Sequence, residues 1–186
     1  MKSRSPALPL LVVALLHGCG NESPTPAITE SAPAATPATA STPTATASAD
    51  NKFVDLQGQP LDLASYAGKK VFLNYWATWC APCIREIPSI ARASAELEDE
   101  NYVFLLASDE SLETIGDFLA DREFTGNFIK LNKFFGAWGI EGVPSSELYD
   151  ENGALVVTWA GPFEWDSPQM LDAIRNGTPM ESRPAP

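Results

Sequence analysis

The segment Lys70–Cys83, with the sequence KVFLNYWATWCAPC, decides the fold. After Lys70 it contains an apolar run that is interrupted only by Asn74, the pattern of a strand buried on both faces. Two cysteines separated by two residues, Cys80 and Cys83, follow the run, and apolar residues at helical spacing come next. The segment therefore predicts a buried strand and, directly after it, a helix that begins at the cysteine pair.

Similar patterns on both sides of this segment predict the remaining elements. Strands are expected at residues 52–56 and 102–107, a helix at residues 111–122, and a strand at residues 154–159 after a hairpin turn at Asp150–Gly153. A last helix is expected to start at Pro168, after Ser167, and to end at Asn176–Gly177. This order predicts a thioredoxin-like α/β fold, in which helices flank a central mixed β-sheet and a β-hairpin extends its N-terminal side.

The composition excludes several classes of function. The chain has 186 residues, of which 45% are hydrophobic, so it can form a core. Its net charge of -12 argues against nucleic-acid binding, which needs clustered cations. The single histidine, His17, lies in a segment that we expect to be cleaved off. A mature chain without histidine excludes Ser-His-Asp and Cys-His hydrolases and nearly all histidine-ligated metal sites.

The N-terminus has the layout of a bacterial export signal. Lys2 and Arg4 precede an apolar run at residues 7–16, which is about half the length that spans a bilayer. The sequence Leu16–Cys19 resembles the lipobox of bacterial lipoproteins, which implies that Cys19 is lipidated and becomes the mature N-terminus. The alternative is an ordinary secretory signal with an incidental cysteine. Gly20 favours sorting to the outer membrane, so we expect a periplasmic, lipid-anchored protein of the bacterial envelope.

The chain is expected to have four parts. Residues 1–18 are predicted to be the signal peptide, and residues 19–50 consist mostly of Ala, Thr, Pro and Ser. Such a composition contains too little apolar surface to offset the entropy of ordering, so we predict a disordered tether. The thioredoxin-like domain is expected at residues 51–180, and residues 181–186 form a C-terminal tail.

The cysteine pair predicts redox chemistry. Cys80 falls at the helix N-terminus, where free amide groups and the helix dipole stabilise a thiolate. We expect Cys80 to be the exposed nucleophile and Cys83 to be the buried resolving thiol. A zinc site and a structural disulfide are the alternatives. Zinc would need two further ligands, and a bridge across so short a loop contributes little stability, so thiol–disulfide exchange is favoured.

The motif also resembles a known family. Residues 72–83, followed by Glu86 and Pro88, are similar to the TlpA/ResA branch of extracytoplasmic thioredoxin-like proteins. The similarity continues through residues 139–144 and the hairpin at residues 150–153. It implies a thiol:disulfide oxidoreductase whose redox disulfide is Cys80–Cys83 and which needs no cofactor and no metal.

The resemblance assigns roles to further residues. Pro144 matches the cis-proline opposite the dithiol, and a cis bond exposes the preceding backbone, so Val143 is expected to pair with the substrate. Trp79 is also expected to contact the substrate. Cytoplasmic thioredoxins have a buried aspartate where this chain has Asn74, which cannot carry a proton. Glu86 is therefore our candidate for the acid that assists Cys83. A solvated helix glutamate is the alternative.

The expected partners also follow from the resemblance. Ala81 and Pro82 place no cation beside Cys80, which favours a reductant. We expect electrons from a membrane thiol-reductant transducer and a disulfide-bearing extracytoplasmic client protein, as in cytochrome c maturation, metal-site assembly or reductase recycling. A Cu(I) chaperone that uses the same cysteines is the second hypothesis, and a peroxidase is the third.

Some residues depart from the family pattern or need a separate interpretation. Glu147 falls in an expected central strand, where a charge is costly unless it is paired or exposed. We interpret it as a structural feature, such as a local bulge, rather than as a second carboxylate under the active site. Trp138, Trp159 and Trp165 are interpreted as core or rim aromatics. Gly136, Gly139 and Gly142 are assigned to a loop without a nucleotide site.

Overall fold

Strand β3 (Lys70–Tyr75) lies in the interior of the sheet, and its apolar residues are buried on both faces. The computed structural model describes residues 51–181. It contains one seven-stranded sheet with the order β2-β1-β5-β4-β3-β6-β7. The other strands are β1 (Phe53–Val54), β2 (Pro60–Leu61), β4 (Tyr102–Ser108), β5 (Asn127–Leu131), β6 (Ser145–Tyr149) and β7 (Leu155–Ala160).

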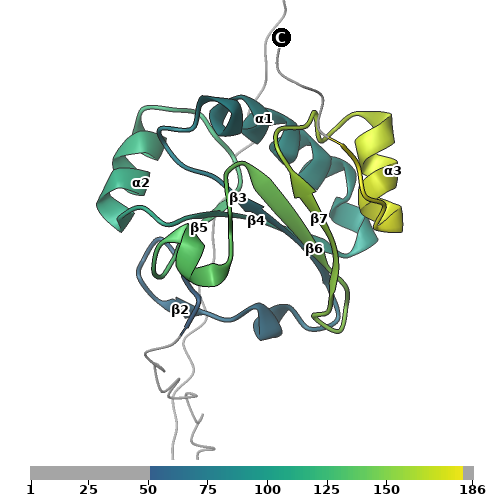
Figure 1. Ribbon diagram of the computed structural model, residues 1–186, viewed down its shortest axis with the longest axis horizontal. Helices are drawn as coiled ribbons and strands as arrows, with labels where there is room; N and C mark the ends of the chain where they lie inside the picture. The colour runs from purple at the N-terminus through teal and green to yellow at the C-terminus, as the bar shows by residue number, and fades with distance from the viewer. Residues whose placement is uncertain (1–50, 182–186) are drawn as a thin grey trace, which may run out of the picture. The chain divides into compact units, whose positions relative to one another are not determined.

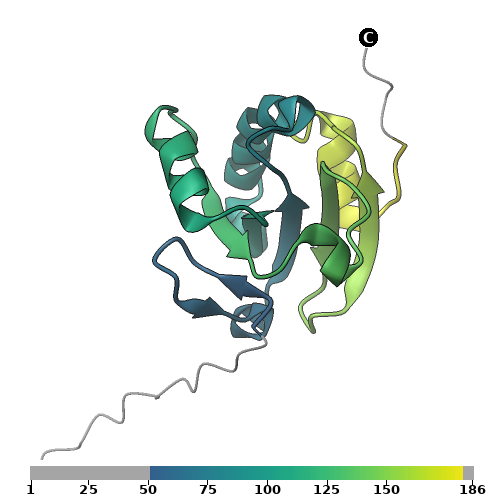
Figure 2. The same ribbon diagram turned by 60° about the vertical axis from the view of Figure 1, so that its left-hand side comes forward.

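The pairing of the strands makes the sheet mixed. Strands β3, β4 and β5 run parallel, whereas β6 runs antiparallel to β3 and β7 antiparallel to β6. The short hairpin β1–β2 joins β5 at the edge opposite β7, as Figure 2 shows. This is the predicted thioredoxin-like α/β architecture with its N-terminal hairpin. Strand β5 has no counterpart among the predicted elements.

Three α-helices cover one face of the sheet (Figure 1). They are α1 (Ala81–Glu96), α2 (Leu112–Ala120) and α3 (Pro168–Asn176). Ser111 and Ser167 cap the N-termini of α2 and α3, because each hydroxyl accepts a hydrogen bond from a backbone N–H of the first turn. The opposite face is covered by the hairpin β1–β2 and by the 3-10 turns η1 (Leu63–Tyr66) and η3 (Phe135–Trp138). A third 3-10 turn, η2 (Glu98–Glu100), follows α1.

The sheet thus has an apolar core on each face. The helical face contains the cysteine pair together with Phe72, Trp159 and Trp165. The opposite face contains Leu73 and Tyr75 of β3, the strand that also carries Phe72. Successive residues of β3 point to opposite faces, so one strand contributes to both cores. The C-terminal end of β3 leads directly into the loop that carries the cysteines.

Candidate active site

The two cysteines form a disulfide at the beginning of α1. Cys80 is the N-cap residue of the helix, and the backbone N–H of Cys83 points at its sulfur atom at 3.3 Å. Pro82 lies in the first turn, where its missing N–H costs no helical hydrogen bond. The free amides at this helix end favour negative charge on Cys80 whenever the disulfide is opened.

The prediction that Cys80 is exposed is wrong for the oxidised state of the protein. Cys80 is only 4% exposed and Cys83 is fully buried, because the bond to Cys83 holds the sulfur of Cys80 against the start of the helix. The neighbouring Trp79 is instead 70% exposed, more than any other large apolar side chain in the described part of the chain. A partner that approaches the disulfide therefore meets a tryptophan beside it.

A carboxylate fixes the loop that precedes the cysteines. Glu110, which follows β4, accepts hydrogen bonds from the backbone N–H of Thr78 at 2.7 Å and from its hydroxyl at 2.6 Å. The hydroxyl of Ser108 donates to the same carboxylate at 3.0 Å. The neighbouring Asp109 accepts from the backbone N–H of Phe135, at the start of η3. Two successive residues at the end of β4 thus hold two loops at the active-site end of the sheet.

Glu86 is a buried carboxyl one turn after Cys83 on α1. It is 3% exposed and accepts three hydrogen bonds, one from β3 and two from residues 163–165. The side-chain amide of Asn74 donates to Oε1 at 2.8 Å. The backbone N–H of Phe163 and the indole N–H of Trp165 both donate to Oε2 at 3.1 Å. The alternative of a solvated glutamate is thereby contradicted.

Burial raises the pKa of Glu86 from its ordinary value of 4.5 to about 7. The three donors act in the opposite direction, because they stabilise the ionised carboxylate. A carboxyl that titrates near neutral pH can either hold or release a proton under physiological conditions. Glu86 therefore has the proton affinity that a general base or acid next to Cys83 requires.

The peptide bond between Val143 and Pro144 is cis, as expected. These two residues immediately precede β6, which is antiparallel to β3 with Ser145 opposite Tyr75. The start of β6 and the end of β3 therefore lie at the same end of the sheet, where the cysteine loop begins. A groove of about 390 Å³ runs along this segment and is lined by residues 139–145, Glu147, Thr158, Ala160 and Gly161.

Glu147 lies on the opposite face of the sheet and is paired. Its Oε2 accepts hydrogen bonds from the hydroxyls of Tyr75 and Tyr149, both at 2.7 Å. Lys52 in turn donates to the hydroxyl of Tyr75 at 3.0 Å. Burial, and then Glu147, raise the pKa of both tyrosines, so these hydroxyls stay protonated as donors. This network agrees with the structural interpretation of Glu147, and a register shift in the β6–β7 ladder follows it at Leu148.

The other residues singled out in the sequence form no second functional site within the described part of the chain. Cys19 lies outside the described residues. Within residues 51–181 no three His, Cys, Asp or Glu side chains are grouped so that they could hold a metal ion. No helix in the same range has the length and apolar character to cross a membrane. Trp159 and Trp165 are fully buried core residues, as interpreted, but Trp165 also contacts Glu86.

Two contacts at the candidate site were not predicted from the sequence. The contact of Trp165 with Glu86 had no local signal, because 79 residues separate the two. The contact of Glu110 with Thr78 had a weak signal in the sequence. Asp109 and Glu110 directly follow a parallel strand, and polar groups at the carboxyl ends of neighbouring parallel strands meet at one edge of the sheet.

Comparison with known proteins gives a consistent result. Residues 27–174 match the model of the Redoxin family. A thiol-disulfide oxidoreductase ResA of Bacillus cereus is 31% identical over 105 residues, which are 55% of this chain and 61% of the relative. The thioredoxin-like protein YneN of Bacillus subtilis is 29% identical over 110 residues, 57% of this chain and 65% of the relative. The chain thus spans about three fifths of these relatives.

Solved structures share the fold. The exposed lipoprotein thioredoxin Etrx1 of Streptococcus pneumoniae is 26% identical, with a TM-score of 0.54 over 68% of this chain and 95% of that one. A thiol:disulfide interchange protein of the thioredoxin family from Chlorobium tepidum is 24% identical, with a TM-score of 0.53 over 65% of this chain and 90% of that one. The second similarity establishes the fold alone.

Proposed function

The chain belongs to the Redoxin family, and on this basis we propose that it is a thiol:disulfide oxidoreductase that acts through Cys80 and Cys83. The observation that carries the proposal is the disulfide at the N-terminus of α1, with the buried carboxyl of Glu86 one turn further along the helix. The relatives named ResA support the same activity.

The reaction proceeds in two exchanges in the direction of client reduction. The thiolate of reduced Cys80 attacks one sulfur of the client disulfide, and the other client sulfur leaves as a thiolate that takes up a proton. Cys83 then loses its proton and attacks the sulfur of Cys80, which releases the second client thiol. Two electrons pass to the client, and the Cys80–Cys83 disulfide of the structure is the product state.

Glu86 accepts the proton of Cys83 in the second exchange. The carboxyl is buried one turn along α1 from Cys83 and is hydrogen-bonded to Trp165, which lies in the same core as Cys83. Its pKa is about 7, so near neutral pH much of it is ionised and able to act as a base. Asn74 cannot perform this role, because an amide does not titrate, but it donates a hydrogen bond that orients Glu86.

The client binds beside the disulfide. Trp79 offers an exposed ring next to Cys80, and the groove along Val143 and Pro144 offers space for an extended segment at the same end of the sheet. The client is an extracytoplasmic protein with a disulfide, and a membrane thiol reductant returns electrons to the cysteine pair. A lipid on Cys19 holds the protein in the bacterial envelope, a proposal that the exposed lipoprotein Etrx1 supports.

Trapping of the first exchange tests the activity. In the variant Cys83→Ser the second exchange cannot occur, so a client should stay covalently attached to Cys80 and be visible as a band that disappears on reduction. The matched variant Cys80→Ser should trap nothing, because the nucleophile is absent. Equal trapping by both variants, or by neither, would contradict the proposal.

The direction of electron flow is tested by the reduction potential. Equilibration of the cysteine pair with defined glutathione or dithiothreitol buffers gives this value. A reductant should have a potential below that of protein disulfide isomerase, which is about -180 mV. A value above about -150 mV would identify an oxidant instead.

A further inference from the structure

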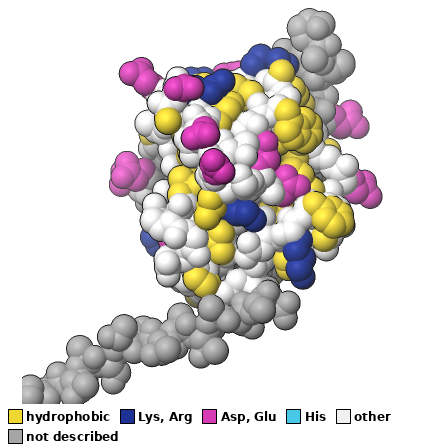
Figure 3. Space-filling view, turned by 90° about the vertical axis from the view of Figure 1, so that its left-hand side faces the viewer, with side chains coloured by type: hydrophobic (Ala, Val, Ile, Leu, Met, Phe, Trp, Pro, Cys, Tyr) yellow, Lys and Arg dark blue, Asp and Glu magenta, His cyan; other side chains and the backbone are white. Residues whose placement is uncertain are grey.

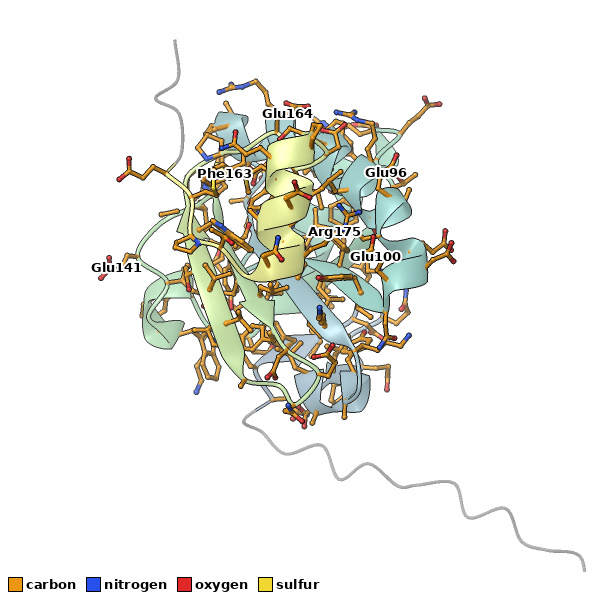
Figure 4. The ribbon with its side chains drawn as sticks, turned by 90° about the vertical axis from the view of Figure 1, so that its right-hand side faces the viewer. Glu96, Glu100, Glu141, Phe163, Glu164 and Arg175 are labelled. Carbon is orange, nitrogen blue, oxygen red and sulfur yellow. A yellow bond between two sulfur atoms is a disulfide. The ribbon has the colours of Figure 1, made fainter. Side chains whose placement is uncertain are left out.

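One stripe along α1 binds the segment that connects β7 to α3. Glu86, Ser89 and Arg92 are spaced three residues apart, so their side chains lie on one side of the helix. All three make hydrogen bonds to residues 163–166, which we call the crossing segment. Figure 4 shows Phe163 and Glu164 of this segment beside the upper end of α3.

The inner contacts of the crossing segment converge on Glu86. The backbone N–H of Phe163 and the indole N–H of Trp165 reach the same carboxylate oxygen, each at 3.1 Å. The backbone N–H of Trp165 donates to the hydroxyl of Ser89, also at 3.1 Å. Both the main chain and the side chain of Trp165 are therefore attached to α1.

The outer contacts are ion pairs at the surface. Arg92 pairs with Glu164 at 3.0 Å and also with Asp166. Arg92 and Glu164 are more than half exposed, so these pairs contribute little stability on their own. Glu164 and Asp166 lie on either side of Trp165 in the sequence. Their ion pairs with Arg92 hold the crossing segment in register along the stripe.

Packing fixes the direction of the indole N–H. Trp165 is fully buried, and its ring lies 4.7 Å from Phe72, 5.5 Å from Trp159 and 5.2 Å from Phe163, measured between centroids. These rings come from β3, β7 and the crossing segment itself. A side chain held on three sides cannot turn its N–H away from Glu86 without repacking the core.

Few other groups face Glu86. Asn74 of β3 donates to the second carboxylate oxygen, and Ser146 of β6 lies behind it, accepting from the same amide at 3.0 Å. Cys83 is one turn back on α1. No charged side chain of the described residues contributes to the pKa of Glu86, which responds to burial and to its three hydrogen-bond donors.

We propose that Trp165 is a positioning residue of the exchange reaction: its indole N–H fixes the carboxyl of Glu86 beside Cys83 and favours the ionised form. The inference rests on the proposed function, because the indole N–H can affect the reaction only if Glu86 exchanges a proton with Cys83. The indole N–H of Trp165 donates to Glu86 and not to a sulfur atom. It acts through Glu86.

Removal of the indole N–H should raise the titration midpoint of Glu86. The carboxylate would lose one of two donors on Oε2 in a buried site, so the ionised form would become less favourable. A hydrogen bond to a charged group is strong enough to move the midpoint of the titration upward by about one pH unit when it is lost. The pH above which Glu86 is mostly ionised, and so able to accept a proton, would rise by the same amount.

The test measures the titration of Glu86 directly. Protein labelled with ¹³C at the glutamate carboxyl is titrated by NMR in the oxidised state, in which neither active-site thiol titrates. The Glu86 signal is the one that disappears in Glu86→Gln. We expect the variant Trp165→Phe to raise its midpoint by about one pH unit. Trp159→Phe is the matched control, because its indole N–H donates to the backbone carbonyl of Thr178 and not to Glu86.

The outcomes separate the inference from the proposed function. Equal midpoints in Trp165→Phe and in the wild type, or equal shifts in the two tryptophan variants, would overturn the inference. The function would still stand if Cys83→Ser traps a client. If Trp165→Phe does not fold, benzothienylalanine at position 165 keeps the bicyclic ring and replaces only the N–H by sulfur. The upward shift is expected there too, with a matching shift in the pH profile of exchange.

Discussion

The carboxyl of Glu86 is buried in the folded protein and exposed to water in the unfolded chain, so its proton affinity differs between the two states. The pKa is about 7 in the folded protein, against an ordinary value of 4.5. Between these two pH values the folded state binds a proton that the unfolded state has released, and stability falls as the pH rises. Above pH 7 both states are ionised, and the burial of the charge costs about 3 kcal/mol.

The variant Glu86→Gln should remove this pH dependence. Relative to the wild type, the free energy of unfolding of the oxidised variant should increase by about 3 kcal/mol between pH 4.5 and pH 8. Urea unfolding at each pH measures this difference. The matched control is Glu96→Gln, at the exposed end of the same helix (Figure 4). Its stability should follow that of the wild type at every pH. A constant difference between Glu86→Gln and the wild type would contradict the burial of an ionisable carboxyl.

The sequence predicts the chemistry of single residues unevenly. The spacing of Cys80 and Cys83 after a buried strand, together with the lack of further zinc ligands, predicts a redox pair, and family resemblance adds Glu86. The exposure of Cys80 could not be predicted in the same way, because it depends on whether the disulfide is closed. The contact between Trp165 and Glu86 is not predictable from local pattern, since it depends on how the segment after β7 crosses α1.

At the scale of elements, the end of β4 determines how the cysteine loop is held. Glu110 binds both the backbone N–H and the hydroxyl of Thr78, two residues before Cys80. The variant Glu110→Ala would leave these two donors without their partner, so the loop should open more often. We expect the amide of Thr78 to exchange its hydrogen at least about tenfold faster, which corresponds to the loss of one charge-assisted hydrogen bond.

Hydrogen exchange measured by NMR checks this expectation. Asp117→Ala, an exposed change on α2, is the control and should leave the exchange of the Thr78 amide unchanged. Client exchange by Glu110→Ala should also slow, because Trp79 and Cys80 follow the loosened residue. Unchanged protection of Thr78 in this variant would mean that the loop is held by its other contacts.

Strand β5 shows why one element escapes prediction from sequence. Its five residues contain Phe128, Ile129 and Leu131, but Lys130 interrupts them, so they neither alternate nor form an apolar run. The strand exists because β4 pairs with it on one side and β1 on the other. Elements with long periodic patterns, such as β3 and α1, could be predicted because their own residues carry the signal.

At the scale of the whole molecule, the charge is predominantly negative. The face seen in Figure 3 has acidic side chains over its upper part and only a few Lys and Arg, in agreement with a net charge of -12. The exclusion of nucleic acid as a partner therefore stays a prediction with physical support. The domain boundaries at residues 51 and 180 also stay predictions, because composition alone defines them.

The expected lipid anchor belongs to this largest scale, since it determines where the domain works. A diacylated Cys19 would bury two acyl chains, each worth about 0.8 kcal/mol per CH₂ group, which is enough for stable attachment to a membrane. The variant Cys19→Ala should therefore move the protein from the membrane fraction to the soluble fraction, detected by immunoblotting after cell fractionation. Purified Cys19→Ala should still exchange disulfides, because the cysteine pair is unchanged. Retention of Cys19→Ala in the membrane fraction would instead favour an uncleaved signal or another anchor.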